Sequence, residues 1–143
     1  MAGKSNPLTA RVIVNRMWQW HFGAGIVRTP NNFGILSEPP SHPELLDWLA
    51  ARLMEENWSL KEMHRRMVLS GTYRRTGKVT EEEFGRDPDN RFFGRFAARR
   101  LDAEEIRDAM LSVSGSLTPV PGGAADDQLS GPKRSLYLQT ARW

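Results

Sequence analysis

The chain has 143 residues, of which 39% are hydrophobic and 26% charged, with a formal net charge of +3. This length suits one folded domain, and the composition is ordinary for a globular protein in water. The chain has no cysteine, which excludes disulfides, thiolate nucleophiles and zinc–thiolate sites, and it has no apolar run long enough to span a membrane.

Residues 8–22 are predicted to form the first helix, with Asn6 or Thr9 at its start and Gly23 at its end. Apolar side chains fall almost all the way around this helix when residues are placed 100° apart. Such a pattern is typical of a central, buried helix. The first helix is therefore expected to lie at the centre of the fold.

The polar and aromatic side chains of this helix allow two interpretations. The first is a ligand-binding surface, in which Trp18 and Trp20 stack on sugars or bases and the neighbouring polar groups donate hydrogen bonds. The second is a buried helix whose arginines need carboxylate partners. The apolar pattern favours the second interpretation. The polar candidates are Arg11, Asn15, Arg16 and His21, and the expected carboxylate partners are Asp102, Glu104, Glu105 and Asp108.

Residues 23–40 are rich in glycine, proline and asparagine, which predicts a long loop with fixed turns. The loop also contains several large apolar residues, so we expect it to pack against the body of the protein. Asn31 and Asn32 lie within it and are further candidates for a binding site. Such a site would occupy a cleft between the loop and the first helix.

Two further helices are predicted over residues 41–57 and 58–71. Each begins with a serine followed three residues later by glutamate, the pattern of a capping box, with Ser41 and Ser59 as the caps. The short connection between the two helices implies an antiparallel or steeply crossed pair.

The rest of the chain yields weaker patterns and one strong helix. Thr80 and Asp87 are candidate caps of short helices, and Asp102 is predicted to cap a helix that ends near Gly115. Residues 118–133 are expected to form a flexible loop, and residues 134–143 a short extended segment. The fold class is therefore mainly α: a compact bundle of four or five helices around a central first helix, in one domain over residues 1–143.

Three histidines are the weak candidates for a catalytic role. His21 and His64 lie on predicted helices, and His42 lies at a predicted helix start beside Ser41. A small hydrolase that acts on glycans or esters would need one of them beside a serine or a carboxylate. No motif for a metal site or a cofactor stands out, so we expect neither.

Several long stretches resemble a known family. They include "NPLTARVIVNRMWQWHFGAGIVRTPNNFG", "PSHPELLDWLA", "NWSLKEMHRRMVLSGTYRR", "DPDNRFFGRFAARRLDAEEIRDAMLSVSG" and "RSLYL". In this order they are similar to the planctomycete-type domain of unknown function near the C-terminus of large exported proteins, which often carry a cytochrome-c-like domain. The resemblance implies an exported setting and a chain that is a fragment or truncated relative of a larger multidomain protein. No signal peptide is visible in residues 1–10.

Three functional hypotheses follow, in order of preference. The first is a non-catalytic interaction or scaffolding module, whose partners are other domains or proteins of an exported assembly, with polysaccharide as a further candidate ligand. The second is the small hydrolase. The third is a nucleic-acid-binding domain, which is less favoured because basic and acidic residues are interspersed. Its phosphate contacts would be the arginine pairs at positions 65, 66, 74, 75, 99 and 100.

Overall fold

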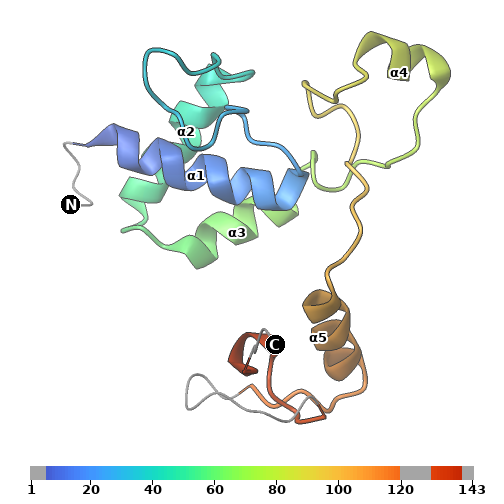
Figure 1. Ribbon diagram of the computed structural model, residues 1–143. Helices are drawn as coiled ribbons and strands as arrows, with labels where there is room; N and C mark the ends of the chain where they lie inside the picture. Colours follow the sequence, from blue (N-terminus) through green and yellow to red (C-terminus); the bar gives the residue numbers. More distant parts are fainter. Residues whose placement is uncertain (1–5, 120–129, 140–143) are drawn as a thin grey trace. The chain divides into compact units, whose positions relative to one another are not determined.

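The structure is a computed structural model that describes residues 6–119 and 130–139. It is mainly helical, as predicted, and the chain divides into two compact units, Met1–Ala98 and Arg99–Trp143 (Figure 1). The elements of the first unit are α1 (Pro7–Phe22), α2 (Pro43–Glu55), α3 (Leu60–Leu69) and α4 (Glu81–Arg86). The second unit contains α5 (Ala103–Val113) and the 3-10 turn η1 (Ser135–Tyr137).

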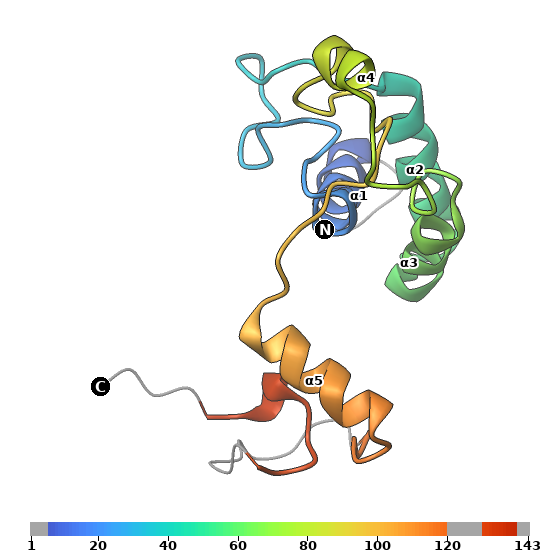
Figure 2. The same cartoon turned by 90° about the vertical axis from the view of Figure 1, so that its right-hand side faces the viewer.

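Helix α1 is the centre of the first unit and contacts both α2 and α3. The Asn6 side chain accepts a hydrogen bond from the Thr9 amide at its start, and Gly23, with φ of 82°, ends it in the left-handed region. The loop that follows lies on the side of α1 away from α3 (Figures 1 and 2). The central position is confirmed, but the expectation of burial all round is wrong, because Leu8 and Trp20 are exposed.

The core of the first unit lies among these three helices and the base of the loop. Deeply buried members include Val14 and Met17 of α1, Leu53 of α2, and Met63 of α3. Burial of such side chains stabilises the fold by about 1.5–3 kcal/mol each. The three-helix arrangement is thus held by apolar packing.

The start of α2 differs from the prediction, whereas the start of α3 agrees with it. Ser59 accepts a hydrogen bond from the Glu62 amide and caps α3, as expected. Ser41 does not cap α2, because the N-cap residue is His42, and the Ser41 hydroxyl instead donates to the Ile26 carbonyl at 3.3 Å. The predicted cap is therefore a contact between the long loop and the start of α2.

The segment after α4 is a side-chain-supported turn. Asp87 was predicted to cap a short helix, which is wrong: its carboxylate accepts from the amides of Arg91 and Phe92 in a non-helical turn. Asn90 holds the same turn closed by pairing with the backbone N–H and C=O of Arg95. Phe93 has φ of 52°, unusual for a bulky residue, and is buried in the core.

The second unit is built on α5, which Asp102 begins with a complete capping box, as predicted. The predicted extended segment at its C-terminal end is instead the turn η1, and Leu138 follows it with extended dihedral angles. Most of the predicted flexible loop, residues 120–129, lies outside the described residues, as do residues 140–143.

Candidate functional site

Asn15 fixes the base of the long loop to α1. Its side chain is fully buried, its Oδ1 accepts from the Val27 amide at 2.8 Å, and its Nδ2 donates to the Val27 carbonyl at 3.0 Å. Gly25 passes so close that a Cβ there would lie 2.5 Å from the Val27 oxygen. Both polar atoms of this candidate binding residue are therefore engaged by the loop backbone.

The tip of the same loop is shaped by further hydrogen bonds. The exposed Arg16 donates to the Asn31 Oδ1 at 3.1 Å, and the Asn32 side chain accepts from the Gly34 amide. The tip then presents Ile35 and Leu36, whose relative exposures are 103% and 91%. The expectation that the loop packs on the body therefore holds for its buried base, around Val27, and is wrong for this tip.

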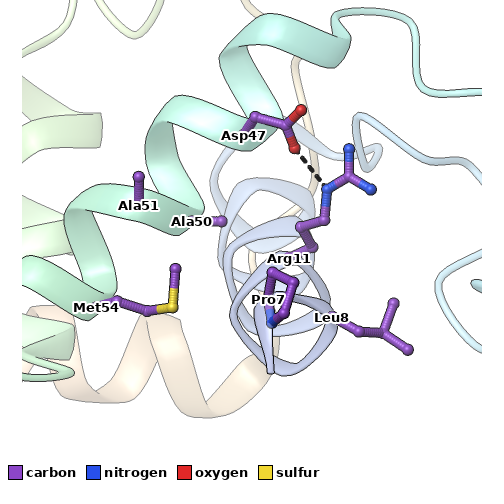
Figure 3. A pocket seen from close by; sticks show the side chains of 7 residues that line it. All are labelled: Pro7, Leu8, Arg11, Asp47, Ala50, Ala51 and Met54. Carbon is purple, nitrogen blue, oxygen red and sulfur yellow. Dashed lines mark hydrogen bonds and ion pairs between the residues drawn. The ribbon is translucent and has the colours of Figure 1, made fainter. Parts of the chain in front are cut away.

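Arg11 lies at the opposite end of α1, on an open pocket of about 460 Å³ (Figure 3). Its Nε donates to the Asp47 carboxylate at 2.5 Å, and the two side chains are 36% and 59% exposed. The remaining lining is apolar and comes from Pro7, Leu8, Ala50, Ala51 and Met54. The expectation that Arg11 and Arg16 pair with acidic residues of the 102–108 region is wrong, because their partners are Asp47 and Asn31.

Trp18 is packed in the core, where it stacks on Phe22 with ring centroids 4.1 Å apart and meets Phe93 edge-on. Its indole Nε1 is buried without a hydrogen-bond partner among the described residues. Trp18 also forms part of the wall of a second open pocket, of about 410 Å³, beside the half-exposed Trp48. Trp18 is therefore packed as expected for a residue of a buried helix, the second interpretation of the first helix.

Two of the candidate histidines come together although they lie 43 residues apart in sequence. His21 Nε2, from the last turn of α1, and His64 Nδ1, from α3, are 2.8 Å apart and form a hydrogen bond. The Tyr73 ring packs edge-on against His21 with centroids 5.8 Å apart. Both histidines are half-buried, so the pair is a polar contact between two core helices.

The third candidate, His42, is separate from that pair. Its Nδ1 lies 3.0 Å from the Ser41 hydroxyl oxygen, and its ring packs against Phe92 and Phe93. The serine hydroxyl also contacts the Ile26 carbonyl. A serine and a histidine thus meet, as the hydrolase hypothesis requires, and a hydrolase activity stays a prediction.

Several of the paired arginines bind to groups of the chain itself. Arg65 and Arg66 pair with Glu62 and Glu56, respectively. The hydrogen bond from Arg66 holds the pKa of Glu56 below its ordinary value. Arg99 pairs with Glu105 and has the same effect on the pKa of that carboxyl. The ion-paired role preferred for these arginines is confirmed at the three positions.

The second unit contains a polar latch between α5 and η1, formed by Arg107, Asp108 and Ser135. Asp108 accepts hydrogen bonds from the amide and hydroxyl of Ser135 at 2.8 and 2.7 Å, and these lower the pKa of Asp108. Arg107 donates to the Ser135 hydroxyl and to the carbonyls of Gly131 and Lys133. The latch attaches the C-terminal segment to α5.

Several of these contacts have no direct signal in the amino-acid sequence. Tyr73, Arg107 and Ser135 were not singled out as candidates, and Asp108 was expected to pair with an arginine of the first helix, because the partners of all four lie far away in the sequence. Asp47 and Asp108 stand on helices as ordinary surface acids would. Among the described residues, no three side chains of histidine or carboxylate type gather as a metal-binding group.

Comparison with known proteins gives one match. A family model described as PSD1, "Protein of unknown function (DUF1553)", matches residues 1–142 of the chain. Neither the search of curated proteins nor the search of solved structures found a match. In the described residues, none of the helices has the length and apolar character needed to cross a membrane.

Proposed function

Since the chain belongs to the PSD1 family of proteins of unknown function (DUF1553), we propose from its own structure that it is a non-catalytic interaction module. The proposed contact surface is the tip of the long loop, formed by residues 34–37. One observation carries this proposal: Ile35 and Leu36 are almost fully exposed on a loop whose base is fixed to the core. Large apolar side chains exposed together mark interaction sites more often than scattered ones do.

The anchoring supports the proposal because a fixed loop loses little conformational freedom when it binds. Asn15 and Gly25 hold the base, and the Arg16–Asn31 contact supports the segment leading to the tip. Binding residues placed on loops above a rigid scaffold are common in proteins. Because such a loop is already ordered, less of the favourable contact energy is offset by the entropy cost of binding, and the affinity is higher.

The partner that fits such a tip is a protein surface with an apolar pocket. Two adjacent aliphatic side chains offer dispersion contacts and area burial but no hydrogen-bonding groups. Their neighbours, Gly34 and Ser37, form a turn through a 3.0 Å hydrogen bond between the Ser37 amide and the Gly34 carbonyl. We therefore favour another domain or protein of an exported assembly over a polysaccharide.

Site-specific photo-crosslinking in cells that produce the native protein tests this proposal. A photoreactive residue at Leu36 should give crosslinks to one defined polypeptide or one defined segment. The matched control places it at Leu60, which is half-exposed on α3. Crosslinks that are equal from both positions would contradict the proposal.

The affinity for the crosslinked partner then supplies the second measurement. The double variant Ile35→Ser/Leu36→Ser should bind it about tenfold more weakly or worse, the loss typical of central apolar contacts. Leu60→Ser should bind it as the wild type does. Unchanged affinity in the double variant would remove the tip from the interface.

A further inference from the structure

The chain contains three pairs of adjacent arginines, and the structure places them in different settings. The pair at 65–66 lies on α3, where both side chains form ion pairs. The pair at 74–75 lies in a turn that is closed by a hydrogen bond from the Arg75 amide to the Thr72 carbonyl. The pair at 99–100 lies outside any helix, strand or turn, at the point where the second unit begins. The third pair is therefore the one in the most open stretch of main chain.

This third pair belongs to a linker, residues 97–101, which is attached to the two units at its ends. Just before the linker, the Phe96 amide donates to the Thr76 carbonyl in the first unit. Just after it, the Asp102 amide donates to the Glu105 carboxylate in the second unit. The ribbon between these two attachments has no helix or strand (Figures 1 and 2).

Most of the linker has a main chain that is open to a partner. Ala98, Arg100 and Leu101 are exposed, and none of them makes a backbone hydrogen bond within the described part of the chain. An extended peptide binds to another protein largely through such main-chain groups, as an added strand does. Exposed segments at domain boundaries are also where proteases cut folded proteins most readily. The linker therefore has the conformation of a protease substrate.

Arg100 supplies the side chain that an arginine-specific endopeptidase recognises. Enzymes of the trypsin type hold the residue before the cleaved bond in an acidic pocket, so that residue must be able to leave its surroundings. Arg100 is exposed and makes no hydrogen bond or ion pair with the described residues. Its neighbour Arg99 donates to both carboxylate oxygens of Glu105, at 2.9 and 2.5 Å. Cleavage after Arg100 is therefore favoured over cleavage after Arg99.

We propose that the Arg100–Leu101 peptide bond is the site at which an arginine-specific endopeptidase cuts this chain between its two units. Water is the co-reactant. The C–N bond breaks, the Arg100 carbonyl carbon gains the hydroxyl and the Leu101 nitrogen gains the hydrogen, and the new ends ionise to carboxylate and ammonium. The cut leaves the core of the first unit, within residues 10–93, in one product and the latch of the second unit in the other.

The start of α5 sets how fast this bond is reached. A protease cleft holds residues on both sides of the cleaved bond, so the chain after Leu101 must leave the first turn of the helix. In that turn, Glu105 accepts hydrogen bonds from the Arg99 side chain and the Asp102 amide. No residue of α5 is buried, so opening this turn breaks only surface contacts. Cleavage then follows the population of the opened form.

Limited digestion of the full chain with trypsin, followed over time by intact-mass spectrometry, tests the proposal. The first products of the wild type should be residues 1–100 and 101–143. The Arg100→Gln chain should remain intact about tenfold longer, because the other basic residues are held by more structure. The matched control is Arg74→Gln, which changes an exposed arginine that also has no ion-pair partner among the described residues. It should be cut as fast as the wild type.

Glu105→Gln provides the complementary test, because it weakens the contacts that hold the first turn of α5 closed. This variant should be cut after Arg100 about two- to fivefold faster than the wild type, the change expected from losing one exposed ion pair. A first cut at another basic residue, or an Arg100→Gln chain digested as fast as the wild type, overturns the proposal. The proposed function is unaffected by either result, because the loop tip lies far from this bond in the sequence and takes no part in the cut.

Discussion

The two units of the chain are stabilised by different means. The first unit has a continuous apolar core, which includes side chains from α1, α2 and α3 and the base of the long loop. In the second unit, α5 has no buried residue, and the contacts that hold η1 against it are the charged and polar bonds of the latch. The stability of the first unit should therefore depend mainly on the volume of its buried side chains. The stability of the second unit should depend mainly on the charge of the latch residues.

Truncating a buried side chain should lower the stability of the first unit more than any other change proposed for it. Leu53→Ala deletes a fully buried side chain of α2 and should lower the free energy of unfolding by about 2–5 kcal/mol. Urea denaturation followed by tryptophan fluorescence measures this change, since Trp18, Trp20, Trp48 and Trp58 all lie in the first unit. Leu60→Ala, at a half-exposed position, should cost far less, and equal losses would contradict the assigned core.

Closing the space between α1 and the loop should have the next largest effect. Gly25→Ala places a Cβ against Val27 and Asn15, so the loop base must shift, at a cost of about 1–3 kcal/mol. Gly85→Ala is the control, because nothing lies within 4 Å of a Cβ there. The same urea titration compares the two variants. A Gly25→Ala protein as stable as Gly85→Ala would show that the loop base is not fixed as described.

The latch should give the second unit a sensitivity to acid. The hydrogen bonds from Ser135 lower the pKa of Asp108, so the stabilisation is complete above the unfolded-state pKa, about 3.9, and is lost as pH falls through the lower folded-state pKa. The Ser135 amide chemical shift, followed by nuclear magnetic resonance, should report this titration.

Asp108→Asn provides the control for that titration, because it keeps an oxygen acceptor and removes the ionisable group. The Ser135 shift should then be constant across the acid range. A midpoint at or above the ordinary aspartate value in the wild type would contradict the latch.

The smallest effect is expected at the Arg11–Asp47 ion pair on the first unit. Both partners are exposed, so Asp47→Asn should change the free energy of unfolding by less than about 1 kcal/mol. The difference should shrink further in added salt. A larger loss, measured in the same urea titration, would show that charge matters as much in the first unit as in the second.

The sequence predicted the features that depend on local spacing. The helices over residues 8–22, 41–57 and 58–71 and the caps at Ser59, Thr80 and Asp102 follow from periodicity and short-range hydrogen bonds. Ser41 fits the same capping pattern but makes a contact with Ile26, fifteen residues away. The capping rule considers only a nearby backbone amide that donates to the serine, and cannot foresee a carbonyl acceptor that the tertiary fold brings close.

The candidate site was predicted as a set of residues but not as an arrangement. Asn15 stood out as a polar residue on an apolar helix, yet its role depends on Val27 arriving beside it. The pairing of His21 with His64, and that of Arg11 with Asp47, likewise require the packing of helices that the sequence does not place. The interspersed basic and acidic residues indicated that the arginines form ion pairs, but they did not indicate which acid pairs with which arginine.

Amide hydrogen exchange, resolved by residue, tests the central claim that an anchored base presents an exposed apolar tip. The Val27 amide, which is bound to Asn15, should exchange only with unfolding of the first unit, whereas the amides of Ile35 and Leu36 should exchange through local opening. In Gly25→Ala, protection at Val27 should fall toward that of the tip. Equal, low protection at Val27 and Ile35 in the wild type would contradict the account.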